Sequence, residues 1–127
     1  MTTYIVDSWA WIEYFRGSEI GGRAKSQIEA ATSITPTIVL AEMSRKFRQL
    51  GRTDLPEKLN FIKQRSTVLP LDESTALLAG EIRANSPVQG MGLVDCVLLA
   101  VARLYSAKVV TGDPHFRALP EAEFIGD

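Results

Sequence analysis

The chain has 127 residues, is 46% hydrophobic and 23% charged, and has a formal net charge of −1, which predicts one globular domain spanning residues 1–127. No apolar run approaches the roughly 18 residues that a membrane-spanning helix needs, and the N-terminus lacks the basic and long apolar stretches of a signal peptide. One cysteine and one histidine exclude an internal disulfide and a zinc site of the Cys/His kind, so the sequence predicts a cytoplasmic protein without membrane contact.

The first half of the chain alternates short β-rich runs with longer helical segments. In chain order we predict a strand at Thr3–Val6, a helix capped by Asp7-Ser8 and ending at Gly17, a helix at Glu19–Ala31, a strand at Ser33–Thr35 and a helix from Thr37 to Gly51. Two adjacent glycines, Gly21 and Gly22, weaken the second of these helices. In the last helix, apolar residues at helical spacing are predicted to share one face: Val39, Leu40, Met43, Phe47 and Leu50.

The second half continues the same alternation. Its predicted elements are a helix through about Gln64, a strand at Thr67–Leu69, a helix capped by Asp72 through about Arg83, a loop from Asn85 to Gly92, a helix at Leu93–Tyr105, and strands at Lys108–Thr111 and Phe124–Ile125. Short strands that alternate with longer helices are typical of an α/β fold with a parallel sheet. In such sheets, ligands gather at the carboxyl ends of the strands.

Two aspartates directly follow predicted strands. Asp7 comes after the strand at Thr3–Val6, and Asp113 comes soon after the strand that ends at Thr111. Each also stands where a helix N-cap is expected, and Pro114 suits a first helical position. Both are therefore candidate site residues as well as candidate caps.

Two further acids lie on predicted helices. Asp95 interrupts the segment Leu93–Ala102, which is apolar nearly all round, as in a helix buried in the protein. A carboxylate there is costly unless it is paired, bound to a metal or stabilised by the helix dipole. Glu42 flanks the apolar face of its helix, and a surface salt bridge to Lys46 at i+4 is the alternative to a place in a site.

Other conspicuous side chains give weaker indications. His115 is predicted to be a surface residue at a helix start rather than a general base, and Cys96 a small buried apolar residue. Trp9 and Trp11 point to opposite sides of one helix, which predicts core packing for one of them. The combination of four acids describes a magnesium or manganese site, because both ions prefer hard oxygen ligands.

A basic segment lies between Met43 and Arg65, where seven basic residues stand against two acids. Such a segment is able to steer a polyanion toward the protein. Its candidate contact residues are Arg45, Lys46, Arg48 and Arg52. The alternatives are a solvated helix face and a surface used by a partner protein, and charge alone does not choose among them.

Four short motifs, taken in order, resemble those of a known family. They are Ile5-Val6-Asp7-Ser8, Leu40-Ala41-Glu42, Val94-Asp95-Cys96-Val97-Leu98-Leu99-Ala100 and Val110-Thr111-Gly112-Asp113-Pro114-His115-Phe116. In this order and chain length they resemble PIN-domain nucleases, and most closely the VapC-type toxins of prokaryotic toxin–antitoxin pairs. The resemblance covers essentially the whole chain.

The resemblance implies a three-layer α/β/α fold in which the acids meet at the carboxyl edge of a central parallel sheet: Asp7, Glu42, Asp95 and Asp113. It implies a metal-dependent endoribonuclease that uses one or two Mg²⁺ or Mn²⁺ ions. Asp7 and Asp95 are expected to be the main ligands of these ions. It also implies a homodimer and a small antitoxin that blocks the site, while the basic segment becomes a candidate contact to the RNA backbone. Ser8 and Thr111 match positions that support the acids.

One departure from the family pattern is Gly112, where relatives often carry a larger or basic residue. This change affects expected substrate contacts rather than metal binding. Every expected acid is present in the sequence, so nothing marks the chain as an inactive enzyme.

Other readings of the sequence are weaker. A haloacid-dehalogenase-like phosphatase needs a second aspartate where this chain has Trp9, and a response-regulator receiver needs paired acids and a late lysine that are not evident. A non-catalytic RNA- or partner-binding domain on the same fold remains open, as does a housekeeping RNA-processing nuclease. Metal-dependent cleavage would argue against the non-catalytic domain. An antitoxin gene beside this one would argue against the housekeeping nuclease.

Overall fold

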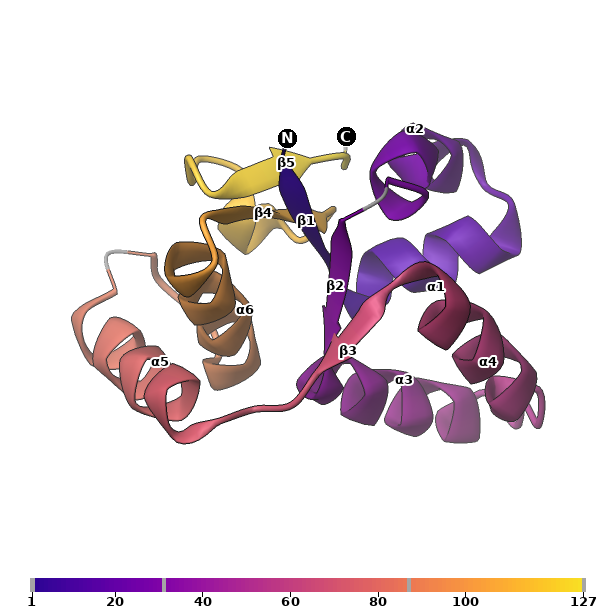
Figure 1. Ribbon diagram of the computed structural model, residues 1–127, viewed down its shortest axis with the longest axis horizontal. Coiled ribbons are helices and arrows are strands. Elements are labelled where there is room, and N and C mark those ends of the chain that lie inside the picture. Colours follow the sequence, from indigo (N-terminus) through magenta and orange to yellow (C-terminus); the bar gives the residue numbers. More distant parts are fainter. Residues whose placement is uncertain (1, 31, 87, 127) are drawn as a thin grey trace.

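The computed structural model describes residues 2–30, 32–86 and 88–126, and in these ranges the chain forms a sheet of five parallel strands (Figure 1). The strands are β1 (Thr3–Val6), β2 (Ser33–Pro36), β3 (Thr67–Leu69), β4 (Ala107–Thr111) and β5 (Ala122–Phe124). Their order across the sheet is β3-β2-β1-β4-β5. The predicted parallel α/β architecture is therefore confirmed.

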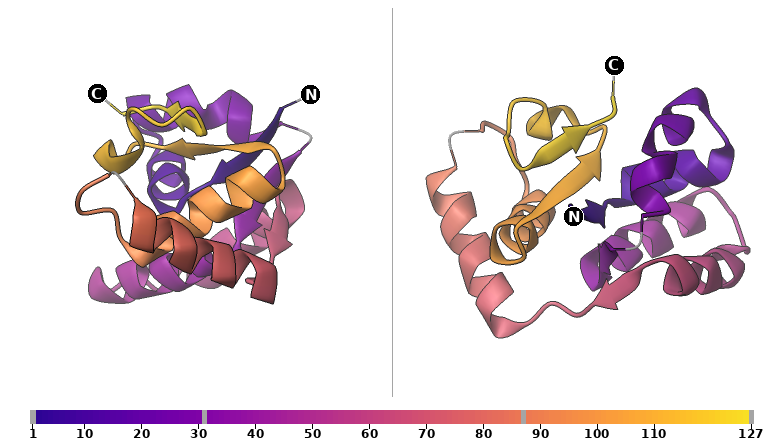
Figure 2. Two further views of the ribbon diagram at one scale, coloured as in Figure 1. Left: turned by 90° about the vertical axis from the view of Figure 1, so that its left-hand side faces the viewer. Right: turned by 45° about the horizontal axis from the view of Figure 1, so that its top comes forward.

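Helices lie on both sides of the sheet. They are α1 (Ser8–Arg16), α2 (Glu19–Ile28), α3 (Thr37–Gln49), α4 (Leu55–Arg65), α5 (Glu73–Asn85), α6 (Leu93–Leu104) and the short 3₁₀ helix η1 (Pro114–Phe116). In Figure 1, α5 and α6 stand on one side of the sheet, α1, α2 and α4 on the other, and α3 lies along the lower edge. The two turned views of Figure 2 show the same layers, which confirms the predicted three-layer α/β/α arrangement.

The core is centred on β1, β4 and α6. Ile5, Val6, Val109 and Val110 are fully shielded from solvent, because both faces of the central strands are covered by helices. Helix α6 is buried from Cys96 through Ala102, as its nearly all-apolar sequence predicts.

Trp11 is the core tryptophan that the sequence predicts on one side of α1. It is fully buried and stacks on Phe15 with a ring-centroid distance of 5.4 Å. Its indole N–H donates to the hydroxyl of Thr35 at 3.1 Å, and that hydroxyl lies 2.7 Å from the Ser66 Oγ. This buried chain of polar groups satisfies the indole and joins α1 to β2 and to the start of β3.

Several predicted boundaries shift in the structure. Helix α2 ends at Ile28, with the predicted end at Ala31 lying outside the described residues, whereas α5 continues to Asn85. The last strand is Ala122–Phe124 rather than Phe124–Ile125, because β4 begins at Ala107 and pairs Val109 with Ala122.

The predicted inclusion of Leu50 in the apolar face of α3 is wrong. Leu50 is the C-cap of α3 and remains 60% exposed, whereas Val39, Met43 and Phe47 are buried. Helical periodicity ends with the helix, so an apolar residue at the next position has no defined face. Within the described residues, no helix combines the length and apolarity needed to cross a membrane.

Candidate active site

The topology of the sheet creates a crevice beside β1. From β1 the chain first builds the sheet through β2 and β3, and then returns to add β4 and β5 on the other side of β1. Adjacent connections that leave in opposite directions open a crevice at the carboxyl ends of the two strands. Asp7 follows β1, and Asp113 lies two residues after β4. Val6 at the end of β1 pairs with Val110 of β4, so the two strands end side by side.

Asp7 is both a helix cap and a buried acid. Its carboxylate accepts a hydrogen bond of 2.7 Å from the backbone N–H of Ala10, which caps α1, and the residue is only 5% exposed. Burial raises its pKa from 3.8 to about 7, against the opposing effect of hydrogen bonds from Thr111 and Ala10. Repulsion from Glu42 and Asp113 raises this pKa further. A cap alone needs no such burial, which favours a binding role for Asp7 as well.

Asp95 lies in the first turn of α6 and reaches the same crevice. Desolvation raises its pKa from 3.8 to about 6, and repulsion from Asp113 and Glu42 adds to this rise, while His115 lowers it. The apolar surroundings inferred from the sequence are therefore present. They leave the carboxylate partly uncompensated beside two other acids.

Asp113 is held by a short network around η1. Its backbone N–H donates to the hydroxyl of Thr111 at 3.0 Å, and its carboxylate accepts from the backbone N–H of His115 at 2.9 Å. The predicted N-cap at Asp113, with Pro114 in the first helical position, is thus present in a 3₁₀ helix. Thr111, predicted to support the acids, contacts both Asp113 and Asp7.

Glu42 is held by the other predicted supporting residue. The hydroxyl of Ser8 donates to Glu42 Oε1 at 3.0 Å, across 34 positions of sequence. No ion pair between Glu42 and Lys46 occurs in the described part of the chain. The tertiary contact with Ser8, rather than the local i+4 pair, orients this carboxylate toward the crevice.

The four predicted acids line one pocket of about 380 Å³. Its lining residues are Asp7, Ser8, Trp9, Glu42, Asp95, Leu98, Gly112, Asp113 and Pro114, with no lysine or arginine among them. Carboxylates that share a pocket and have raised pKa values are unbalanced in charge, and a divalent cation is the group that balances them. The hard oxygen donors fit Mg²⁺ or Mn²⁺.

His115 keeps a partly exposed side chain, as predicted for a surface residue, and it also lies close to two of the acids. It does begin a short helix, but its Nδ1 lies 3.0 Å from Asp113 Oδ1 and 3.4 Å from Asp95 Oδ2. One donor atom each from Asp95, Asp113 and His115 falls within a span of 4.8 Å, the arrangement of a possible metal site. The spacing His115–Asp113 was a local signal for this contact, whereas the approach of Asp95 depends on the fold.

Trp9 and Gly112 form one wall of the acidic pocket. A Cβ at position 112 would overlap the outer ring of the Trp9 indole, so a larger residue there would require the indole to move. The departure from the family pattern at Gly112 therefore accompanies a large aromatic side chain at position 9. The indole of Trp9 occupies the space that a side chain at position 112 would enter.

The basic segment provides exposed cations near the site. Arg45, Lys46 and Arg48 are exposed on α3, and Arg45 and Lys46 lie about one helical turn beyond Glu42. Arg52 is also exposed, but its guanidinium forms a two-pronged ion pair with Asp54. Of the four predicted contacts, Arg52 is thus the one with a local acidic partner in the described residues.

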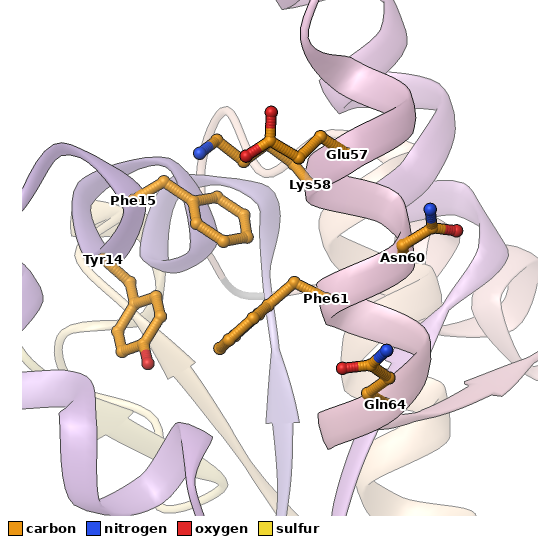
Figure 3. Close-up of a pocket in the computed structure, with 7 residues that line it drawn as sticks. All are labelled: Tyr14, Phe15, Glu57, Lys58, Asn60, Phe61 and Gln64. Atoms are coloured by element: carbon orange, nitrogen blue, oxygen red, sulfur yellow. The ribbon is translucent and has the colours of Figure 1, made fainter.

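A second pocket, of about 410 Å³, lies between α1 and α4 (Figure 3). Its lining residues are Tyr14, Phe15, Glu57, Lys58, Asn60, Phe61 and Gln64. In Figure 3, Tyr14 and Phe15 face Phe61 across the hollow, and the rings of Phe15 and Phe61 are 5.7 Å apart between centroids. None of the four candidate acids lines it, and its lining combines three aromatic rings with four polar or charged side chains.

Solved structures of the same fold were found at low sequence identity. A toxin–antitoxin complex from Klebsiella pneumoniae superposes with a TM-score of 0.79 at 14% identity, covering 98% of this chain and 99% of that one. VapBC2 from Rickettsia felis, bound to a DNA fragment from its promoter, gives 0.73 at 17% identity, covering 95% and 96%. VapC20 from Mycobacterium tuberculosis, a sarcin-ricin loop cleaving toxin, gives 0.70 at 18% identity, covering 87% and 92%.

At these identities the structural likeness shows the fold. A search of curated protein sequences found no significant match. The sequence model of the PIN domain, however, matches residues 4–122, a range that contains all four acids and the whole sheet apart from Thr3, Glu123 and Phe124. The chain therefore belongs to the PIN domain family.

Proposed function

We propose that this protein is a metal-dependent endoribonuclease and the toxin of a type II toxin–antitoxin pair. The observation that carries the proposal is the pocket in which Asp7, Glu42, Asp95 and Asp113 converge from four separate elements at the switch point of the sheet. Membership of the PIN family supports nuclease chemistry. The similarity to a toxin–antitoxin complex and to a toxin that cleaves the sarcin-ricin loop supports the toxin role and an RNA substrate.

In this proposal Asp7 and Asp95 are the main metal ligands, and Glu42 and Asp113 hold a second ion or orient water. A divalent ion bound there would activate water and neutralise charge on the scissile phosphate. Ser8 keeps the Glu42 carboxylate turned into the pocket through its 3.0 Å hydrogen bond. Thr111 fixes the backbone of Asp113 and donates to Asp7, which stabilises the ionised form of that buried acid.

The proposed partners are an RNA, an antitoxin and a second copy of the chain, in the cytoplasm. We place an apolar anchor of the antitoxin in the aromatic pocket between α1 and α4, because aromatic pockets with polar rims are typical anchoring sites of protein interfaces.

The test is cleavage of a labelled single-stranded RNA in Mg²⁺, in Mn²⁺ and in EDTA. We expect cleavage only with a metal ion, and a loss of at least roughly 100-fold in Asp95→Asn, because a ligand and a charge are removed together. Glu73→Gln is the matched control, because Glu73 is an exposed acid in the first turn of α5. This variant should cleave RNA at the wild-type rate. Unchanged cleavage by Asp95→Asn would contradict the assignment. If the wild type neither cleaves RNA nor binds a metal ion, a non-catalytic RNA- or partner-binding domain is favoured instead.

The basic residues of α3 are proposed to contact the RNA backbone. Replacing Arg45 and Arg48 together by alanine should weaken RNA binding and reduce the slope of log affinity against log salt by about 0.7 for each lost phosphate contact. Lys108→Ala is the control, because Lys108 is exposed near the start of β4, at the opposite edge of the sheet from the acids. Binding measured by fluorescence anisotropy at several salt concentrations decides. An unchanged slope in the double variant would assign this face to solvent or to the partner protein.

A further inference from the structure

His115 is the nitrogen-bearing side chain at the rim of the acidic site. Its Nδ1 is shielded from solvent and makes no hydrogen bond within the described residues, although two carboxylates lie at 3.0 and 3.4 Å. The imidazole is thus within ion-pairing distance of both acids, although neither contact has the geometry of a hydrogen bond. A buried polar atom in that state calls for a ligand.

The distances match those between donors on one metal ion. Two donors bound at about 2.1 Å to the same ion lie about 3.0 Å apart at a right angle and about 3.4 Å apart at the tetrahedral angle. The two contacts of His115 Nδ1, to Asp113 Oδ1 and to Asp95 Oδ2, have these two lengths. One donor atom each from Asp95, Asp113 and His115 lies within 4.8 Å of the others, so a small side-chain movement would bring all three to one ion.

The imidazole is also held in place from behind. The backbone N–H of His115 is fixed by the Asp113 carboxylate, and Phe116, the next residue, is fully buried. On the far side of the ring, a Cβ at Gly90 would come to 3.3 Å from Nε2, so the loop backbone closes against it. These contacts hold Nδ1 toward the acids before any ion binds, which lowers the ordering cost of coordination.

We propose that His115 is a nitrogen ligand of the metal ion held by Asp95 and Asp113, and that the site consequently binds Zn²⁺ and Co²⁺ in preference to Mg²⁺. Imidazole is a ligand of these transition ions, whereas Mg²⁺ is bound through oxygen. The inference rests on the proposed function for the presence of a metal, but it concerns which ion the site selects. Glu42 and Asp7 remain oxygen donors from the other side of the pocket.

The alternative is that His115 is a protonated counter-ion of the acids, and the two roles predict opposite results. Calorimetry with Zn²⁺, Co²⁺ and Mg²⁺ should show that His115→Ala loses Zn²⁺ and Co²⁺ affinity by roughly 10-fold or more, with Mg²⁺ affinity changed much less. If His115 is a counter-ion, its removal should instead raise the affinity for all three ions, because a competing positive charge is lost. That result would overturn the proposal.

NMR gives a readout that is independent of catalysis. His115 is the only histidine of the chain, so ¹⁵N-labelled histidine in protein without a histidine tag reports on this ring alone. Saturating Zn²⁺ should move the Nδ1 resonance into the metal-bound range while Nε2 keeps its proton. Zn²⁺ that binds by calorimetry but leaves Nδ1 unchanged would exclude His115 as a ligand and leave the nuclease proposal standing. Failure of any ion to bind the wild type would remove both.

Discussion

Replacing Asp7 by asparagine is expected to make the metal-free protein more stable above pH 7 while abolishing RNA cleavage. Asparagine keeps the oxygen that accepts from the Ala10 N–H, and it is as good an N-cap as aspartate. The substitution removes the charge that burial and two neighbouring acids oppose. The predicted gain therefore measures how much stability the fold gives up to keep this acid in the pocket.

The sign follows from the pKa of Asp7, which is raised in the folded state from 3.8 to about 7. The folded protein binds this proton more tightly than the unfolded chain does, so ionisation favours unfolding. Below about pH 4, Asp7 is protonated in both states and does not lower the stability of the wild type. Stability falls as the pH rises from about 4 to about 7, and the loss is complete above about pH 7. The shift corresponds to an upper limit of about 4 kcal/mol, and a gain of half that size would raise the Tm by roughly 5–10 °C.

The measurement is thermal unfolding of both proteins between pH 4 and 8 in EDTA, with Asp72→Asn as the matched control. Asp72 also caps a helix, accepting from the Thr75 N–H at 2.9 Å, but it is exposed and its pKa is lowered by that hydrogen bond. Asp72→Asn should therefore give no gain at high pH. Saturating Mg²⁺ or Mn²⁺ should raise the Tm of the wild type more than that of Asp7→Asn, which lacks one of the proposed ligands. A variant that is less stable than the wild type at pH 8, by a gap that does not depend on pH, would contradict this account.

The elements of this fold could be predicted because their signals are local. The apolar run of α6, the N-caps at Asp7 and Asp72, and the glycine that ends α1 depend on residues within a few positions of one another. The predicted boundaries differ from the structure where pairing with another strand sets the ends of an element. The ends of β5, for example, are set by its pairing with β4. Periodicity alone gave no information on where a helical face ends, and Leu50 was misplaced for this reason.

The site could be predicted in part for the same reason. Asp95 gave a usable signal, because an acid in an otherwise apolar helix is costly without a partner. Glu42 did not, since its hydrogen bond to Ser8 spans 34 positions and Lys46 offered an equally good local partner. The contact between His115 and Asp95 could not be predicted, because Asp95 belongs to α6, which approaches only when the chain has folded. Local chemistry identified candidates, and tertiary contact alone reveals which of them share a pocket.

The two adjacent glycines of α2 differ in their packing, and this difference could not be predicted from the sequence. From the sequence, Gly21 and Gly22 weaken the helix equally, because each costs about 1 kcal/mol relative to alanine. In the structure they differ: Gly21 is buried against the end of α1, whereas a Cβ at Gly22 would meet nothing within 4 Å. A Cβ at Gly21 would overlap the carbonyl oxygen of Glu13 and lie 2.8 Å from the Cα of Tyr14.

Opposite effects are therefore expected from the same substitution at these neighbouring positions. Gly22→Ala should stabilise the protein by about 1 kcal/mol, because the helix gains propensity and no contact is disturbed. Gly21→Ala should destabilise it by about 3 kcal/mol or more, because backbone atoms of α1 cannot move aside as a flexible side chain would. Urea unfolding of both variants measures the difference. Since the N-terminus of α1 also holds Asp7, Gly21→Ala should reduce metal affinity in the fraction that remains folded, whereas Gly22→Ala should leave it unchanged. Similar effects of the two substitutions would mean that α1 and α2 do not pack as closely as this structure has them.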